Sequence, residues 1–249
     1  MMPVQADHAI QLRLLDLQAA DTALAQLAHR RHTLPELAAL AERTTQGSTL
    51  ADELLDAQTR ASDVADEQRR LENEVDTVRS RATRDEQRMQ SGGLPGKELE
   101  GLQHELVTLA RRQSSLEDQL LEVMEEREVV DANVAELAAR RAALDADVSE
   151  LTTARDAAFA ELDSSGAERA TEREAIAAEI PRDLLALYER AREHGGGVGA
   201  AVLRQRRCEG CHIELSGSEL SAVRAAAADE VVRCENCRRI LVRTDESGL

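Results

Sequence analysis

Apolar residues recur at alternating steps of three and four along two long stretches of the chain, residues 54–89 and 99–162. A repeat of this period places an apolar stripe along one side of a helix and is typical of a coiled coil. A shorter stripe with the same spacing occupies residues 10–24. The pattern therefore predicts that most of the chain forms long helices.

The segment SGGLPGKE, residues 91–98, separates the two long stripes. Glycine and proline at this density cannot continue a helix, so the chain must turn here. Because the arms on either side are similar in length, we expect an antiparallel helical hairpin with its tip near residues 91–97. Pro35 predicts an interruption of the first arm, and the segments 44–49 and 162–169 predict weaker points.

Polar residues replace apolar ones at four positions of the second long stripe, 14 residues apart: Gln113, Arg127, Arg141 and Arg155. Polar residues in such a stripe can fix the register of a coiled coil at a cost in stability. Alternatively, the arginines lie at the edge of the stripe and extend their charged ends into solvent. We favour this second interpretation.

All the cysteines lie near the C-terminus in two Cys-x-x-Cys pairs, Cys208 with Cys211 and Cys234 with Cys237. Two such turns separated by a folded insert supply four thiolates with the spacing of a structural zinc site. Disulfides, a redox-active dithiol and c-type haem attachment, which the sequence CEGCH also matches, are the alternatives. Reduced thiols in the cytoplasm disfavour disulfides, a dithiol needs one pair on an α/β fold, and haem attachment would need translocation. We therefore expect one structural Zn²⁺ at these four residues.

Three other features bear on this site. Gly210 and Asn236 occupy the same place in each turn and tolerate left-handed backbone conformations, which predicts two similar zinc knuckles. His212 is expected to be an exposed neighbour rather than a ligand. Four thiolates leave no open coordination position, and the chain has no phosphate loop, nucleophile elbow or helical His-Glu-x-x-His. We expect neither enzyme activity nor a small-molecule substrate.

The segments around the cysteines predict strands at 199–207, 230–234 and 238–244, with a short helix between the pairs that begins at Ser216 and carries Glu219 at capping-box spacing. The predicted fold is mainly α: a long antiparallel coiled-coil helical hairpin followed by a small β-rich C4 zinc ribbon.

We expect three parts along the chain. The hairpin covers residues 1–165, a helical connector with a glycine-rich hinge covers 166–199, and the zinc ribbon covers 200–249. The sequence HGGGVG at the end of the connector predicts a mobile joint.

Composition and charge agree with this fold. The chain has one Phe, one Tyr and no Trp, so a thick globular core is not expected. Neither a signal peptide nor a membrane-spanning stretch is recognised, so we expect a cytoplasmic protein without membrane contact. The net charge of −17 belongs to the part before Arg182, because the remainder holds 11 arginines and 11 acidic residues. Such an acidic surface disfavours indiscriminate binding of nucleic acid.

Three segments carry a family resemblance: KELEGLQHELVTLARRQ after the turn, LLALYERAR before the cysteines, and CEGCHIELSGSEL with VVRCENCRRIL around them. They resemble bacterial coiled-coil hairpin proteins that end in a C4-type zinc ribbon, related to a flagellar-regulatory, sigma-54-interacting zinc-ribbon protein. The resemblance implies zinc ligation by the four cysteines and an adaptor role linked to gene expression; some relatives are linked to sigma-54 handling and to RNA binding in flagellar control. Arg238 departs from the family pattern, in which glycine is expected after the last cysteine.

Two classes of function follow. In the first, the hairpin is a scaffold that binds a protein partner, with a locally basic tip as the candidate contact. The candidate tip residues are Arg81, Arg84, Arg88 and Lys97. The alternative for this tip is an ordinary solvated helix surface.

In the second class, the ribbon binds RNA or DNA phosphates through arginines near the cysteines. The candidates are Arg204, Arg206, Arg207, Arg233, Arg238, Arg239 and Arg243. Acidic residues nearby offset their charge, and the ribbon has no aromatic residue to stack on bases. We therefore favour the protein scaffold.

Overall fold

The computed structural model describes residues 4–249 and divides into two compact units. The base unit combines residues up to 37 with residues 153–249, and the hairpin unit holds residues 38–152. Each unit is described separately below.

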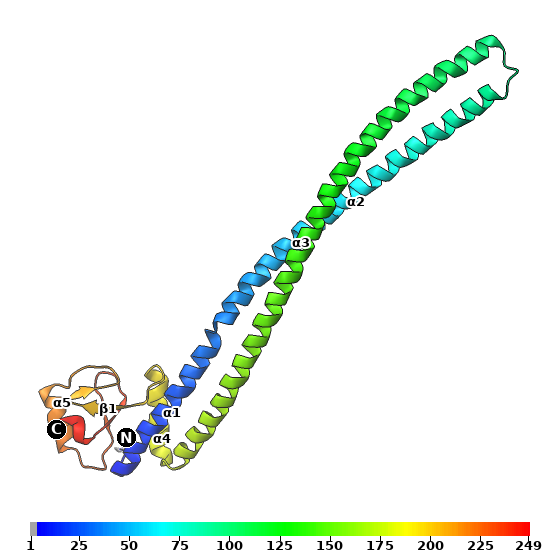
Figure 1. The fold of residues 1–249 in the computed structure, drawn as a ribbon. Helices are drawn as coiled ribbons and strands as arrows, with labels where there is room; N and C mark the ends of the chain where they lie inside the picture. Colours follow the sequence, from blue (N-terminus) through cyan, green and yellow to red (C-terminus); the bar gives the residue numbers. More distant parts are fainter. Residues whose placement is uncertain (1–3) are drawn as a thin grey trace. The chain divides into compact units, whose positions relative to one another are not determined.

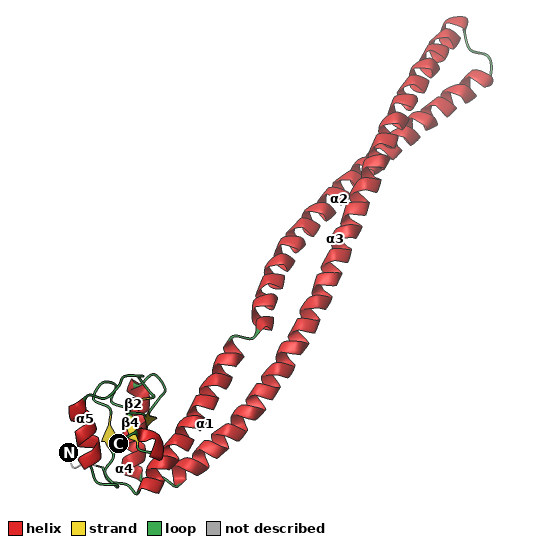
Figure 2. Cartoon of the chain, turned by 60° about the vertical axis from the view of Figure 1, so that its left-hand side comes forward, coloured by secondary structure: helices red, strands yellow, loops and turns green. Residues whose placement is uncertain are grey.

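Four helices account for most of the chain: α1 (His8–His32), α2 (Pro35–Gln90), α3 (Gly96–Ala178) and α4 (Arg182–His194). The predicted interruption at Pro35 is confirmed, because α1 ends at His32 and α2 begins at Pro35; Figure 2 shows the loop between them.

The predicted hairpin is also confirmed. Figure 1 shows α2 and α3 side by side and joined by a turn at the predicted tip. Gly92 and Gly93 adopt positive φ angles of 72° and 82° in this turn, a conformation that glycine adopts at little cost.

The predicted apolar stripes form the seam of the hairpin unit. One cluster contains Leu50, Ala57 and Leu137, and another contains Leu71, Val75 and Leu116. The positions between the stripes face solvent, so the hairpin is held by one narrow line of contacts.

The weak points predicted at 44–49 and 162–169 are wrong, since α2 and α3 continue through them. In the first segment the hydroxyl groups of Thr44, Thr45 and Thr49 donate to carbonyls one turn earlier, which is compatible with a helix. In the second segment Leu162 is buried, and burial of an apolar side chain offsets the low helix propensity of its neighbours.

Two of the polar seam positions contact the opposite helix. Arg127 donates to the side chain of Gln68 over 2.9 Å, and Arg141 donates to the carbonyl of Gly47 over 2.9 Å. Their charged ends thus reach across the seam rather than only into solvent, and each contact suits one alignment of α2 with α3.

The C-terminal part of the base unit is a small sheet with one short helix. Its elements are β1 (Ala200–Arg204), β2 (Arg207–Cys208), α5 (Gly217–Ala225), β3 (Val232–Arg233), β4 (Ile240–Val242) and the 3-10 helix η1 (Asp245–Ser247). The strand order is β2-β1-β4-β3, with β1 parallel to β4 and the other pairs antiparallel. The predicted capping box at Ser216 and Glu219 is confirmed.

The sheet shares a hydrophobic core with the helices of the base unit. Leu14 and Leu17 of α1, Tyr188 of α4, and Ile240 and Val242 of β4 are buried together. The predicted boundaries at 165 and 199 stay a prediction. The described core nevertheless joins α1 and α4 to the sheet, and α3 runs on to Ala178.

The glycine-rich segment between α4 and β1 is hydrogen-bonded along its length. Gln18 accepts from the Gly199 amide over 2.7 Å and donates to the Gly197 carbonyl over 3.2 Å. Arg239 donates to the carbonyls of Gly195 and Val198. These bonds argue against the mobile joint predicted from the composition of this segment.

A buried carboxylate lies beneath this segment. Asp21 is 5% exposed and accepts hydrogen bonds from Arg173 (2.7 Å), Arg192 (3.2 Å) and the Tyr188 hydroxyl (2.7 Å). Glu189 pairs with both arginines. The network ties α1, α3 and α4 together inside the base unit.

Candidate metal centre

The two Cys-x-x-Cys turns have matching backbone hydrogen bonds. In the first, the amide of His212 donates to the Cys208 carbonyl over 2.7 Å; in the second, the amide of Arg238 donates to the Cys234 carbonyl over 2.9 Å. Each turn is anchored beside a strand, β2 for the first and β3 and β4 for the second. The prediction of two similar knuckles therefore agrees with the described backbone.

The predicted position of the left-handed residues is wrong. Gly210 and Asn236 do not have positive φ angles; instead His212 and Arg238, each directly after the second cysteine, have φ angles of 61° and 63°. The amide of the residue after the second cysteine turns back and donates to the carbonyl of the first cysteine. The left-handed conformation accompanies that hydrogen bond. Arg238 thus keeps the conformation that favours glycine although it is not glycine.

Gly210 serves a different purpose. A Cβ atom at this position would lie 2.6 Å from Cδ of Arg239 and 3.0 Å from Cβ of Ala201. Arg239 is itself held because it donates to the Gly210 carbonyl over 2.7 Å, as well as to the carbonyls of the glycine-rich segment. Glycine is required here for close packing of the first knuckle.

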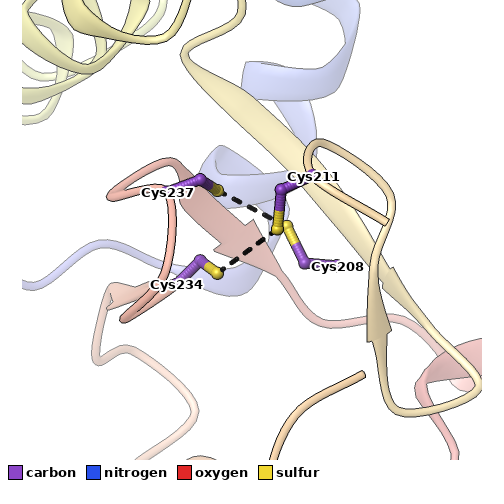
Figure 3. A group of neighbouring side chains, drawn as sticks. All are labelled: Cys208, Cys211, Cys234 and Cys237. Carbon is purple, nitrogen blue, oxygen red and sulfur yellow. Dashed lines mark hydrogen bonds between the residues drawn. The ribbon is translucent and has the colours of Figure 1, made fainter. Parts of the chain in front are cut away.

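The four thiol groups converge, as Figure 3 shows, and their sulfur atoms lie within 4.8 Å of one another. The Sγ atoms of Cys208 and Cys237 are 3.8 Å apart, and those of Cys211 and Cys234 are 3.9 Å apart. A tetrahedral zinc with Zn–S bonds of about 2.3 Å places its sulfurs about 3.8 Å apart. The arrangement fits one tetrahedral zinc.

The protonation of the thiols also fits a metal centre. Burial raises the pKa of Cys208 and of Cys234 above the ordinary thiol value. Burial opposes ionisation of Cys237 as well, but hydrogen bonds from the Arg239 amide and neighbouring thiols lower its pKa to about 7. Buried thiolates need a nearby cation, and a divalent ion held by all four supplies it.

The site is closed and structural. Four sulfur ligands complete the coordination of zinc and leave no position for a catalytic water. His212 lies outside the four-cysteine group, is exposed, and has Nδ1 4.0 Å from a carboxylate oxygen of Glu209. The zinc therefore holds the two knuckles, and through them β2, β3 and β4, in place.

The arginines predicted to bind nucleic acid fall into two groups. Some form hydrogen bonds or ion pairs through their guanidinium groups within the described residues, and the others form none. Arg239 donates to three carbonyls, as described above. Arg243 donates to the carbonyls of Ala226 (2.9 Å) and Ala227 (2.6 Å) after α5, so its charge caps the end of that helix. Both arginines have internal structural roles.

The remaining five predicted arginines are exposed. Arg204 pairs with Glu246, and Arg206 and Arg233 each donate to a backbone carbonyl. Arg207 and Arg238 have no hydrogen bond or ion pair of their guanidinium groups within residues 4–249. These two are the least engaged of the predicted set.

The basic tip is partly neutralised. Arg81 forms an ion pair with Glu105, and Arg88 forms one with Glu98. In the part of the chain that the structure describes, Arg84 and Lys97 form no ion pair. The predicted basic tip rested on the charges only as far as residue 97. The antiparallel turn brings acidic residues of α3, which lie beyond that point, opposite the arginines of α2.

Two features of the base unit were missed from the sequence. One is the network around Asp21, and the other is a pocket beside the second knuckle that includes Arg190 and His194. An acidic residue within the first apolar stripe and the only tyrosine of the chain were signals for the network. The pocket had no local signal.

Family comparisons agree with this architecture. Residues 17–196 match the CT398-like coiled coil hairpin domain, and residues 207–241 match the C4-type zinc ribbon domain. Neither family description names an enzyme. No helix among the described residues is long and apolar enough to cross a membrane.

Curated relatives resemble the chain over nearly its whole length. An uncharacterized protein of Mycobacterium tuberculosis is 40% identical over 97% of this chain and 98% of its own. An uncharacterized protein of Mycobacterium leprae is 36% identical over 86% of this chain and 91% of its own.

Solved structures show the same fold. A structure from Mycobacterium smegmatis is 40% identical, covers 97% of this chain and 100% of its own, and has a TM-score of 0.86. The structure of CT398 from Chlamydia trachomatis is 18% identical, covers 95% of this chain and 98% of its own, and has a TM-score of 0.68. The chain thus belongs to the family of CT398-like coiled-coil hairpin proteins and carries a C4-type zinc ribbon at its C-terminal end.

Proposed function

We propose that this protein is a non-enzymatic cytoplasmic adaptor whose helical hairpin binds a protein partner. One observation carries the proposal: the hairpin unit buries a single seam and leaves large apolar side chains exposed on α3. Val107, Leu121, Met124 and Val129 are between 41% and 70% exposed. Apolar side chains that a coiled coil does not use for its own packing are available to a partner.

The tip supplies a charged contact for the same partner. Arg84 and Lys97 are the candidate tip residues without an ion pair among residues 4–249, whereas Arg81 and Arg88 are neutralised by α3. Unpaired charges steer association with an oppositely charged surface more effectively than paired ones. We therefore narrow the proposed contact to Arg84 and Lys97 and expect an acidic partner surface.

Reversing both charges tests this contact. We expect Arg84→Glu combined with Lys97→Glu to reduce partner capture from nuclease-treated lysate about tenfold, because favourable charge steering becomes repulsion. Helicity and zinc content should not change, since both residues are exposed. Captured polypeptides would be quantified by mass spectrometry.

The matched control reverses Arg111 and Arg140, which are exposed arginines of α3 away from the tip. This control should retain capture. Undiminished capture by the tip variant, or an equal loss in the control, would exclude the tip as the contact.

Nucleic-acid binding by the ribbon is the second candidate, supported by the exposed, unengaged guanidinium groups of Arg207 and Arg238. The family resemblance to flagellar-regulatory proteins supports a link of either function to gene expression. Replacing both arginines with glutamate should then remove nuclease-sensitive material from the captured fraction, whereas Arg224→Glu on α5 should not. An unchanged nuclease-sensitive fraction would count against this second candidate.

A further inference from the structure

A pocket of about 420 Å³ lies between α4 and the second zinc knuckle, within the base unit. Its lining residues are Leu187, Arg190, Ala191, His194, Arg233 and Arg238. Leu187 and Ala191 are buried, whereas the four basic side chains are exposed. The pocket therefore combines an apolar floor with a basic rim.

The positive charge of this pocket is not neutralised by neighbouring acids. No acidic residue lines it, and its three arginines form no ion pair with any described part of the chain. Arg173 and Arg192 of the same unit, by contrast, both pair with carboxylates. All the lining residues belong to the part of the chain that begins at Arg182, in which arginines and acidic residues are equal in number, so three unpaired guanidinium groups around one concave surface make the pocket locally basic.

Two hydrogen bonds organise the rim. Arg233 donates through Nε to the Arg238 carbonyl over 3.0 Å, which places these two arginines next to each other. His194 shares a hydrogen bond of 2.7 Å between its Nδ1 and the Arg190 carbonyl, so Nε2 is the ring nitrogen left for another partner. The terminal nitrogens of Arg233 and all those of Arg190 and Arg238 have no bond within residues 4–249.

The second observation concerns the residue type at position 238, because the left-handed backbone there belongs to the knuckle and is shared by His212 in the first turn. The φ angle of 63° at Arg238 is a conformation in which a side chain costs stability and glycine does not. The knuckle explains the conformation but not the choice of arginine at a position that favours glycine, which is a reason to look for a functional role of this side chain. Packing does not explain the arginine, because its guanidinium group is exposed and makes no internal contact by hydrogen bond or ion pair among the described residues.

We propose that this pocket binds a phosphate group, with Arg190, Arg233 and Arg238 as its cationic contacts. The planar fork of a guanidinium group matches two phosphate oxygens, and several such groups suit a dianion. The apolar floor at Leu187 and Ala191 contacts the body to which the phosphate is attached. The phosphate belongs either to a free nucleotide or to a nucleic acid.

Neutralisation of the zinc centre is the competing explanation, because four thiolates on one Zn²⁺ carry a net charge of about −2. Arg238 directly follows the ligand Cys237 and could serve that purpose. Arg190, however, belongs to α4 and is not part of either knuckle. A phosphate site therefore requires Arg190, whereas neutralisation of the zinc centre does not.

The experiment measures binding of three probes to the full-length, zinc-loaded protein: AMP, adenosine, and a single-stranded oligoribonucleotide with internal phosphates only. We expect at least one phosphate-bearing probe to bind and adenosine not to bind. Arg190→Glu and Arg238→Gly should each weaken that binding about tenfold or more, because each removes a charge-assisted hydrogen bond. Arg182→Glu, on the same helix but outside the pocket, is the matched control.

Arg238→Gly distinguishes a loss of phosphate binding from a loss of folding. Glycine suits the left-handed backbone, so this variant should keep its zinc and retain or raise its thermal midpoint while it loses phosphate affinity. Binding of AMP identifies a nucleotide as the source, and binding of the oligoribonucleotide alone identifies a nucleic acid.

Three outcomes would overturn the proposal: no phosphate-bearing probe binds, adenosine binds as well as AMP, or the pocket variants bind as the wild type and Arg182→Glu do. The experiment also distinguishes this site from the second candidate function, because free AMP can bind here even if the ribbon binds no nucleic acid.

Discussion

Removing zinc is expected to unfold the ribbon and to expose the core of the base unit, while the hairpin unit keeps its helices. Structural zinc contributes about 10–16 kcal/mol of apparent binding free energy in small zinc domains. The strands here are only two to five residues long, so the sheet has little stability of its own. The seam clusters of the hairpin unit involve no residue of the ribbon.

Hydrogen exchange measures this effect by region. Chelation, or Cys208→Ser, should abolish protection of residues 200–243 and reduce it in α1, whose Leu14 and Leu17 lose their packing against β4. Residues 50–78 should remain protected. The matched control is His212→Ala, next to a ligand but outside the four-cysteine group, which should retain one zinc per chain. Equal protection of the ribbon with and without zinc would contradict the structural role of the metal.

Acidification should also release zinc, because protons compete with the metal for the cysteine sulfur atoms. Burial raises the pKa of Cys208 and Cys234, so in the metal-free protein these thiols favour the protonated form. Zinc and protons compete for the sulfur atoms, and zinc affinity therefore falls as the pH falls. A zinc-sensitive dye should report increasing release toward lower pH, and release that is independent of pH would be inconsistent with thiolate ligands.

Asp21→Asn is expected to have the second largest effect, a loss of about 3 kcal/mol in the free energy of unfolding of the base unit. The carboxylate is buried and accepts from two arginines and a tyrosine, so the change leaves Arg173 with an incompletely compensated charge. Burial, followed by the bond to Asp21, raises the pKa of Tyr188, and the bond to Asp21 raises that of Arg173. The raised pKa of Tyr188 and the raised pKa of Arg173 both indicate a tightly coupled network.

The control for this network is Asp16→Asn. Asp16 also lies on α1 and pairs with Arg13 over 2.7 Å, but its side chain is 53% exposed. An exposed pair contributes at most about 1 kcal/mol. Denaturant unfolding, followed at Tyr188 fluorescence, should show a much larger loss for Asp21→Asn. Similar losses in both variants would contradict a buried, coupled network.

The sequence predicted what depends on local pattern. The seam from Leu102 to Leu162 and the turn at Gly92 and Gly93 follow from periodicity and from glycine conformation, and the structure confirms both. The zinc ligands follow from two repeated Cys-x-x-Cys spacings, which the sulfur geometry fits.

What depends on contacts between distant residues was not predictable in the same way. Asp21 and Tyr188 are 167 positions apart, and the acidic residue in the apolar stripe of α1 indicates a buried partner but not which residue supplies it. The partial neutralisation of the tip is a shorter-range example, because Glu98 and Glu105 oppose Arg88 and Arg81 only after the chain has turned. The sequence prediction placed the left-handed residue of each knuckle two positions too early. Residue type alone suggested the earlier position, whereas the backbone conformation depends on the hydrogen bond to the carbonyl of the first cysteine.

The base unit is built from both ends of the chain, which has a consequence for biosynthesis. The amide of Ala6 donates to the Asp229 carbonyl over 2.8 Å, and Leu14 and Leu17 are completely buried by segments that include β4. On the ribosome, α1 is made long before α4 and β4, so the part of its apolar face that these elements cover stays exposed while the hairpin is translated. The hairpin unit can close earlier because its contacts need only residues 38–152. Folding of the zinc ribbon then completes the cover over α1, which until that point is accessible to chaperones and proteases.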